Sequence, residues 1–130
     1  MCISILGVIA ATVAKMIVGT LWYSESLFGK LWMRLGRHTP DAQTMKHGII
    51  GSMISSFVLA SIMGCFMARL GINTIESALY FGFMAWLGFV ATISLEGALW
   101  NKQNINVYFI SMGSHLVGML AMALILSRFI

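Results

Sequence analysis

Four long apolar segments dominate the hydrophobic pattern of this chain, and each is long enough to cross a bilayer as a helix. They cover residues 3–23, 47–70, 75–100 and 105–129. A transmembrane helix needs about 20 consecutive, mostly apolar residues, because each residue adds about 1.5 Å to its length. Residues 71–74 and 101–104 form short polar turns between the later segments. The pattern predicts an all-α fold, an integral membrane bundle of four transmembrane helices forming a single domain over residues 1–130.

The first connection, residues 24–46, is long enough to hold structure of its own. Apolar and aromatic residues recur on one face at helical spacing, and Lys and Arg recur on the other. This predicts an amphipathic helix lying in the headgroup region of the membrane, with a solvated loop as the alternative. Aromatic residues just before it fit an interfacial belt. The expected interfacial anchor consists of Trp22, Tyr23, Phe28, Lys30, Trp32 and Arg34.

The composition indicates a membrane protein, and the lipid bilayer is its expected partner. Apolar residues make up 59% of the chain and charged residues 9%, against roughly 25% charged in soluble domains. A soluble domain of this size could not bury so much apolar surface. The net charge of +4 does not indicate nucleic-acid binding, because the basic residues form no patch with interleaved aromatics. Half of them lie in the first connection.

The distribution of Lys and Arg predicts the orientation. The first and third connections hold five of these residues, and the opposite side holds two, Arg69 and Arg128. The positive-inside rule then places both termini outside, in the periplasm for a bacterial inner membrane. The N-terminus has no basic region and no cleavage site, so we expect the first segment to stay as a permanent helix.

Small residues repeat every fourth position along the second segment. Such rows let membrane helices approach closely, so we expect this face to pack helices and to carry homo-oligomer contacts. It consists of Gly48, Ser52, Ser56, Ala60, Gly64 and Ala68.

Three ionisable residues, Lys15, Glu96 and His115, fall on the small or polar faces of the first, third and fourth segments. A charge at mid-bilayer is costly, so an unpartnered one is not expected. Their depths, counted from the same membrane boundary, differ by less than their side chains can reach. They therefore predict a buried ionisable cluster. It could be a Lys15–Glu96 ion pair that staples two helices, a proton or ion pathway, or a site from which Glu96 snorkels to the interface.

No motif indicates a catalytic centre, a metal site or a cofactor. The chain has no Gly-rich phosphate loop, no nucleophile elbow and no Cys or His pair at metal-ligand spacing. Cys2 and Cys65 lie near the outer ends of their segments, so the sequence leaves open whether they form a disulfide. Equal depth does not by itself bring two cysteines together.

Two motifs resemble a known family. The first is Gly19-Thr20-Leu21-Trp22-Tyr23-Ser24 followed by Leu27-Phe28-Gly29-Lys30 and Trp32, and the second is Trp86-Leu87-Gly88-Phe89-Val90-Ala91-Thr92. The chain is similar over most of its length to a bacterial membrane-protein family catalogued as domain of unknown function 1761. The resemblance implies a four-span fold and supplies no activity.

Three functions are compatible with these features. The first is a homo-oligomeric transporter or channel for a small solute, an ion or protons, with Lys15, Glu96 and His115 as coupling groups. The second is an accessory subunit whose small faces dock onto a larger membrane complex. The third is a membrane-embedded enzyme acting on a lipid or quinone-like molecule, with His115 and Glu96 as acid–base groups. No nucleophile or metal set accompanies the carboxylate, so the enzyme has the weakest support.

Overall fold

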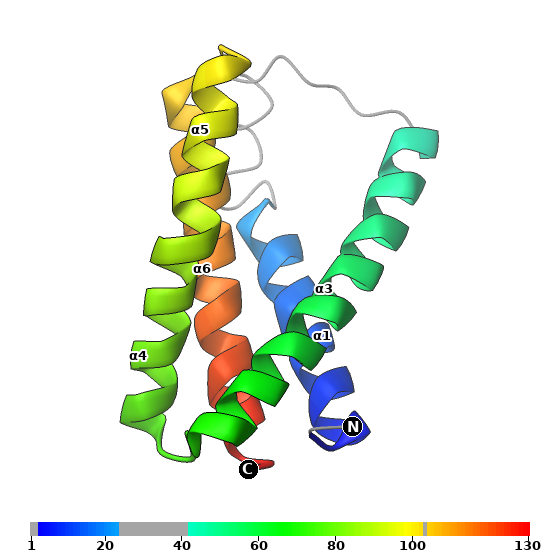
Figure 1. The fold of residues 1–130 in the computed structure, drawn as a ribbon. Helices are drawn as coiled ribbons and strands as arrows, with labels where there is room; N and C mark the ends of the chain where they lie inside the picture. Colours follow the sequence, from blue (N-terminus) through cyan, green and yellow to red (C-terminus); the bar gives the residue numbers. More distant parts are fainter. Residues whose placement is uncertain (1–2, 24–41, 103) are drawn as a thin grey trace.

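The structure is a computed structural model, and it describes residues 3–23, 42–102 and 104–130. All regular elements of these residues are helical (Figure 1). In chain order they are α1 (Ile5–Trp22), α3 (Ala42–Leu70), α4 (Ile75–Ala85), the π-helix η1 (Trp86–Ala91), α5 (Thr92–Trp100) and α6 (Ile105–Ser127). The predicted interfacial helix falls within residues 24–41 for the most part, which lie outside the described residues.

Polar residues cap three of the helices at their N-termini. The Ser4 hydroxyl accepts from the Leu6 N–H at 3.3 Å, and the Asn104 amide oxygen accepts from Asn106 at 2.9 Å. Thr74 accepts from Ser77 at 3.2 Å and so begins α4. These bonds satisfy backbone donors that have no partner within the helix. The helix limits therefore follow from local sequence as well as from apolar length.

Gly71 ends α3 and lets the chain reverse into α4. Its φ is +69°, a left-handed conformation that glycine adopts without strain. The Ile72 N–H bonds the Met67 carbonyl at 3.0 Å, and the Gly71 N–H bonds the Ala68 carbonyl at 3.3 Å. This is the Schellman pattern of helix termination. It explains how α3 and α4 can be joined by so short a turn.

The third span is one continuous helical rod with a π-helical turn in its middle. α4, η1 and α5 follow one another without a break from Ile75 to Trp100. Near the end of η1 the Ala91 carbonyl accepts a hydrogen bond from the Tyr108 hydroxyl of α6 at 2.6 Å. Wide turns of this kind are stabilised where a side chain from a neighbouring helix reaches the backbone. The π-helix is thus tied to the adjacent helix.

Helix α6 lies at the centre of the bundle. It packs against α1 on one side and α4 on the other, while α3 packs chiefly against α1 (Figure 1). The termini lie at the same end of the bundle. The upper part of α3, toward its N-terminus, diverges from α1 (Figure 1). α6 is accordingly the most buried of the four spans.

The helices of the described part confirm the predicted fold class. Four are long and apolar enough to cross a membrane: Ile5–Trp22, Lys46–Leu70, Ile75–Trp100 and Ile105–Ser127. Large apolar side chains cover the outside of the bundle, where lipid can solvate them. Helix α3 begins at Ala42, earlier than the apolar segment itself, so its first turn extends beyond the span. The chain is an all-helical, multi-pass membrane protein.

Candidate functional site

The interface between α1 and α6 holds the polar interior of the bundle. The two helices run antiparallel, and glycines of α6 receive large side chains from α1. A Cβ placed on Gly118 would lie 3.2 Å from Cγ of Lys15, and one on Gly113 would lie 2.7 Å from Cζ2 of Trp22. Both large side chains therefore occupy space that only glycine leaves open.

Lys15 and His115 lie on the same part of this interface. Gly118, which Lys15 covers, follows His115 by one helical turn of α6, so the two ionisable side chains share a face. The charge of Lys15 acts electrostatically on the His115 imidazole. Both side chains are half-buried. Lys15 precedes Trp22 by seven residues, which places it roughly 10 Å from that end of the span.

Glu96 does not join them. It is exposed on α5, whereas α1 packs chiefly against α6 and α3. Among the described residues no ion pair links Glu96 to Lys15 or to His115. Glu76, the other described carboxylate, is exposed near the start of α4. The structure therefore brings together two of the three expected cluster residues, and both are bases.

Two serines of α6 extend this polar face. Ser111 accepts a hydrogen bond from the Tyr23 hydroxyl at 3.2 Å. Ser114 is only 8% exposed. Four residues earlier, the Ile110 carbonyl accepts the indole N–H of Trp22 at 2.8 Å.

Aromatic side chains with a polar atom fix the position of α6, and sequence reasoning did not identify Trp86 and Tyr108 in this role. The indole N–H of Trp86 donates to the Met112 carbonyl at 3.0 Å. Together with the Trp22 bond, this holds α6 from both neighbouring spans. Buried Trp and Tyr usually find a hydrogen-bond partner. The sequence did carry a signal for these contacts: an aromatic residue with a hydrogen-bond donor inside an apolar segment, such as Trp86 or Tyr108.

The expected interfacial anchor is only partly described. Trp22 and Tyr23 are half-buried and donate to α6, so these two side chains help hold α1 to α6. Phe28, Lys30, Trp32 and Arg34 lie outside the described residues.

The row of small residues on α3 divides into two halves. Ser56, Ala60 and Gly64 are buried within the chain, and a Cβ on Gly64 would lie 2.7 Å from a side-chain atom of Ile3. Ala68 is partly buried, whereas Gly48 and Ser52 are exposed. The two residues of the row that precede Ser56 are therefore the ones exposed to contacts outside the chain.

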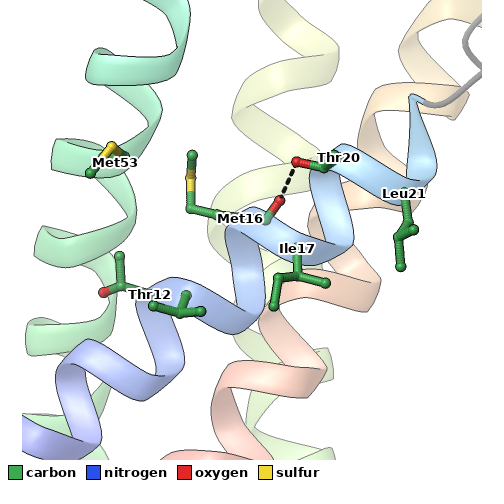
Figure 2. Close-up of a pocket in the computed structure, with 7 residues that line it drawn as sticks. Thr12, Met16, Ile17, Thr20, Leu21 and Met53 are labelled. Carbon is green, nitrogen blue, oxygen red and sulfur yellow. Dashed lines mark hydrogen bonds between the residues drawn. The ribbon is translucent and has the colours of Figure 1, made fainter.

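An apolar groove of about 390 Å³ follows α1 where α3 diverges (Figure 2). Its lining residues are Thr12, Val13, Met16, Ile17, Thr20, Leu21 and Met53. The hydroxyl of Thr12 donates to the Val8 carbonyl at 2.8 Å. The hydroxyl of Thr20 donates to the Met16 carbonyl at 2.9 Å (Figure 2). Both hydroxyls are thus engaged by their own helix, and the groove offers an apolar surface rather than reactive chemistry.

Cys65 is disulfide-bonded in the structure, and its predicted partner, Cys2, lies outside the described residues. The described residues contain no group of three or more His, Cys, Asp or Glu side chains placed to hold a metal ion. The polar chemistry of the described part is therefore concentrated between α1 and α6.

Comparison with known proteins yields one match. The model of a family described as "Protein of unknown function (DUF1761)" matches residues 6–127. This range includes both motifs noted above, all of α6, and all of α1 except Ile5. No curated protein and no solved structure matches the chain.

Proposed function

The chain belongs to this family of proteins of unknown function, and we propose that it is a small transporter or channel for an ion or a small solute. In this proposal it acts as a homo-oligomer in a bacterial inner membrane. Lys15 and His115 are the groups that take up and release the transported species.

The meeting of two bases inside the membrane carries the proposal. Lys15 and His115 lie together on the α1–α6 interface, and no described carboxylate lies against them. A basic residue at mid-bilayer costs roughly 2.5–3.5 kcal/mol on insertion scales. Two bases cannot neutralise each other, so their proximity does not offset this cost. A functional role for the two charges explains this arrangement better than a contribution to the stability of the bundle does.

The competing interpretations have less support. A structural ion pair would require Glu96 beside Lys15, and Glu96 is exposed on another helix. An acid–base enzyme would require Glu96 beside His115, and no interaction joins them among the described residues. A proton or ion route needs neither contact. It needs ionisable groups in the interior of the span, which His115 and Lys15 supply.

Two observations support the proposed orientation. The excess of Lys and Arg in the first and third connections favours a cytoplasmic location for that side. Cys65 lies near the opposite end of α3 and is disulfide-bonded. Disulfides persist in the periplasm and are rare in the cytosol. Both observations favour periplasmic termini.

Flux through reconstituted vesicles tests the proposal. The protein is placed in proteoliposomes that contain a pH-sensitive dye, and a potassium diffusion potential drives ion movement. We expect protein-dependent flux that Lys15→Met and His115→Gln each reduce at least tenfold while the helix content stays unchanged. Lys46→Met is the matched control, because Lys46 is exposed at the start of its span. Equal flux from the parent and both site variants would show that these residues do not serve transport.

An accessory subunit is the second candidate, and the exposed half of the α3 row favours it. Gly48 and Ser52 are exposed, and a Cβ on Gly48 would meet no atom within 4 Å. Such a surface fits a helix of another copy or of a larger complex. Purification at native expression level separates the two. A single polypeptide in the oligomer supports the transporter, and stoichiometric foreign subunits support the accessory role.

A further inference from the structure

A second groove lies in the angle between the end of α3 and the start of α4, at the end of the bundle where the termini lie (Figure 1). Its volume is about 490 Å³, within the roughly 300–1,000 Å³ of typical ligand pockets. Leu70 and Ile72 line it from the end of α3 and the turn that follows, and five residues of α4 between Glu76 and Met84 line its other side. α4 packs chiefly against α6 rather than against α3, so the two helices that border the groove do not close it.

The groove is mostly apolar along its length and carries a charge at one end. Glu76 lies in the first turn of α4 and is exposed, and Tyr80 and Met84 follow it at intervals of four residues on the same face of the helix. Met84 lies roughly 12 Å along the helix axis from Glu76. One leaflet of a bilayer contributes about 15 Å of hydrocarbon. Because the third span begins at Ile75, the groove runs from the headgroup level through most of one leaflet.

Two opposite charges flank the turn at the polar end of the groove without pairing. Arg69 lies in the last turn of α3, next to Leu70 of the lining, and Glu76 lies in the first turn of α4. Both charged side chains are exposed. Among the described residues no ion pair joins them, and no other base pairs with Glu76. A phospholipid with a primary-amine headgroup complements both charges, because its ammonium donates to a carboxylate and its phosphate accepts from a guanidinium.

We propose that this groove binds one such aminophospholipid, with an acyl chain between α3 and α4 and the headgroup between Arg69 and Glu76. Tyr80 and Met84 of the lining are exposed, so the groove is open on its lipid side. An apolar helix of a second copy would fill the groove but leave the carboxylate without a counter-charge, whereas the lipid brings its own. The site is independent of the transport proposed above, because the two bases of the α1–α6 interface lie outside its lining.

Native mass spectrometry measures the lipid bound. The full chain in a nonionic detergent is titrated with phosphatidylethanolamine, phosphatidylcholine or phosphatidylglycerol, all with the same acyl chains. We expect one phosphatidylethanolamine per chain, with a dissociation constant about tenfold below that of phosphatidylglycerol, the effect of one hydrogen bond between charged groups. Phosphatidylcholine should fall between them, because its ammonium carries a charge but has no N–H to donate.

Charge variants separate the two parts of the headgroup. Glu76→Gln should remove the preference for phosphatidylethanolamine over phosphatidylglycerol. Arg69→Gln should weaken the binding of both lipids about tenfold and leave the preference in place, because both carry the phosphate. Glu96→Gln is the matched control and should change neither quantity, since Glu96 is exposed near the other end of the same span, outside the groove.

Filling the groove tests the position of the acyl chain. Leu70→Trp places a larger side chain in the lining and should weaken the binding of all three lipids. Leu79→Trp, on α4 but outside the lining, should leave binding unchanged. A ligand stabilises the folded state that binds it, so phosphatidylethanolamine should raise the melting temperature of the parent chain more than that of Leu70→Trp. Circular dichroism follows melting and checks that each variant keeps its helix content.

Three results would overturn the proposal. Equal affinity of the parent chain for phosphatidylethanolamine and phosphatidylglycerol would show an unselective lipid contact. Binding that neither Glu76→Gln nor Leu70→Trp alters would place the lipid elsewhere on the protein. Loss of an oligomer in Leu70→Trp, with the lipid retained, would assign the groove to a second copy. Flux through vesicles enters none of these measurements, so the transport proposal is tested separately.

Discussion

Replacing Gly113 by alanine tests how α6 is held against α1. The new Cβ would lie 2.7 Å from Cζ2 of Trp22 and 3.2 Å from Cη2. The indole cannot move away freely, because its N–H is bonded to the Ile110 carbonyl at 2.8 Å. The substitution therefore forces either a steric overlap or the loss of this bond.

The magnitude follows from opposing contributions. Overpacking a well-filled interface costs about 1–3 kcal/mol, and losing the hydrogen bond costs about 0.5–1.5 kcal/mol. Alanine in place of glycine in a helix contributes up to about 1 kcal/mol of stability. Gly97→Ala on α5 is the matched control, because its Cβ meets no atom within 4 Å. Since either cost can relieve the other, we expect Gly113→Ala to be about 0.5–3 kcal/mol less stable than Gly97→Ala.

Reversible unfolding in mixed micelles, followed by circular dichroism as the share of sodium dodecyl sulfate increases, measures this difference. A second background isolates the cause. In Trp22→Phe the smaller ring and the missing indole N–H remove the conflict, so Gly113→Ala should then cost less than about 1 kcal/mol. If Gly113→Ala and Gly97→Ala are equally stable in the parent chain, the close packing of the Trp22 ring against Gly113 is refuted.

Three further predictions concern other parts of the molecule. Gly64→Leu should destabilise the monomer, because the new side chain would overlap that of Ile3. Gly48→Leu should instead leave stability unchanged and shift a homo-oligomer toward monomer in light scattering. The opposite ranking would refute the division of the α3 row. Tyr108→Phe should cost about 0.5–1.5 kcal/mol in the same unfolding assay, through the bond to the π-helix; an unchanged midpoint would mean that this bond contributes nothing. A reporter active only in the periplasm should work when fused after Ile130 and fail at Arg37, and the reverse would overturn the orientation.

Apolar length alone was sufficient to identify the four spans, because a lipid environment requires long uninterrupted helices with internally satisfied backbones. Apolar length is a property of a single helix, so the order of residues along that helix contains it. Placement on a face of small or polar residues did not decide burial in the same way: Lys15 and His115 are half-buried, whereas Glu96 is exposed.

The partners across helices depended on the tertiary structure. Equal depth suggested that Glu96 would meet Lys15, but depth leaves the rotation and neighbours of each helix open, and α1 packs chiefly on α6 and α3. The row on α3 likewise gave no sign of which half is buried, because the divergence of two helices depends on all of their contacts. The hydrogen bond from the Trp22 indole to the Ile110 carbonyl could not be read along the chain either. A hydrogen bond between residues so distant in sequence exists only once register, rotation and crossing angle have been set together by packing.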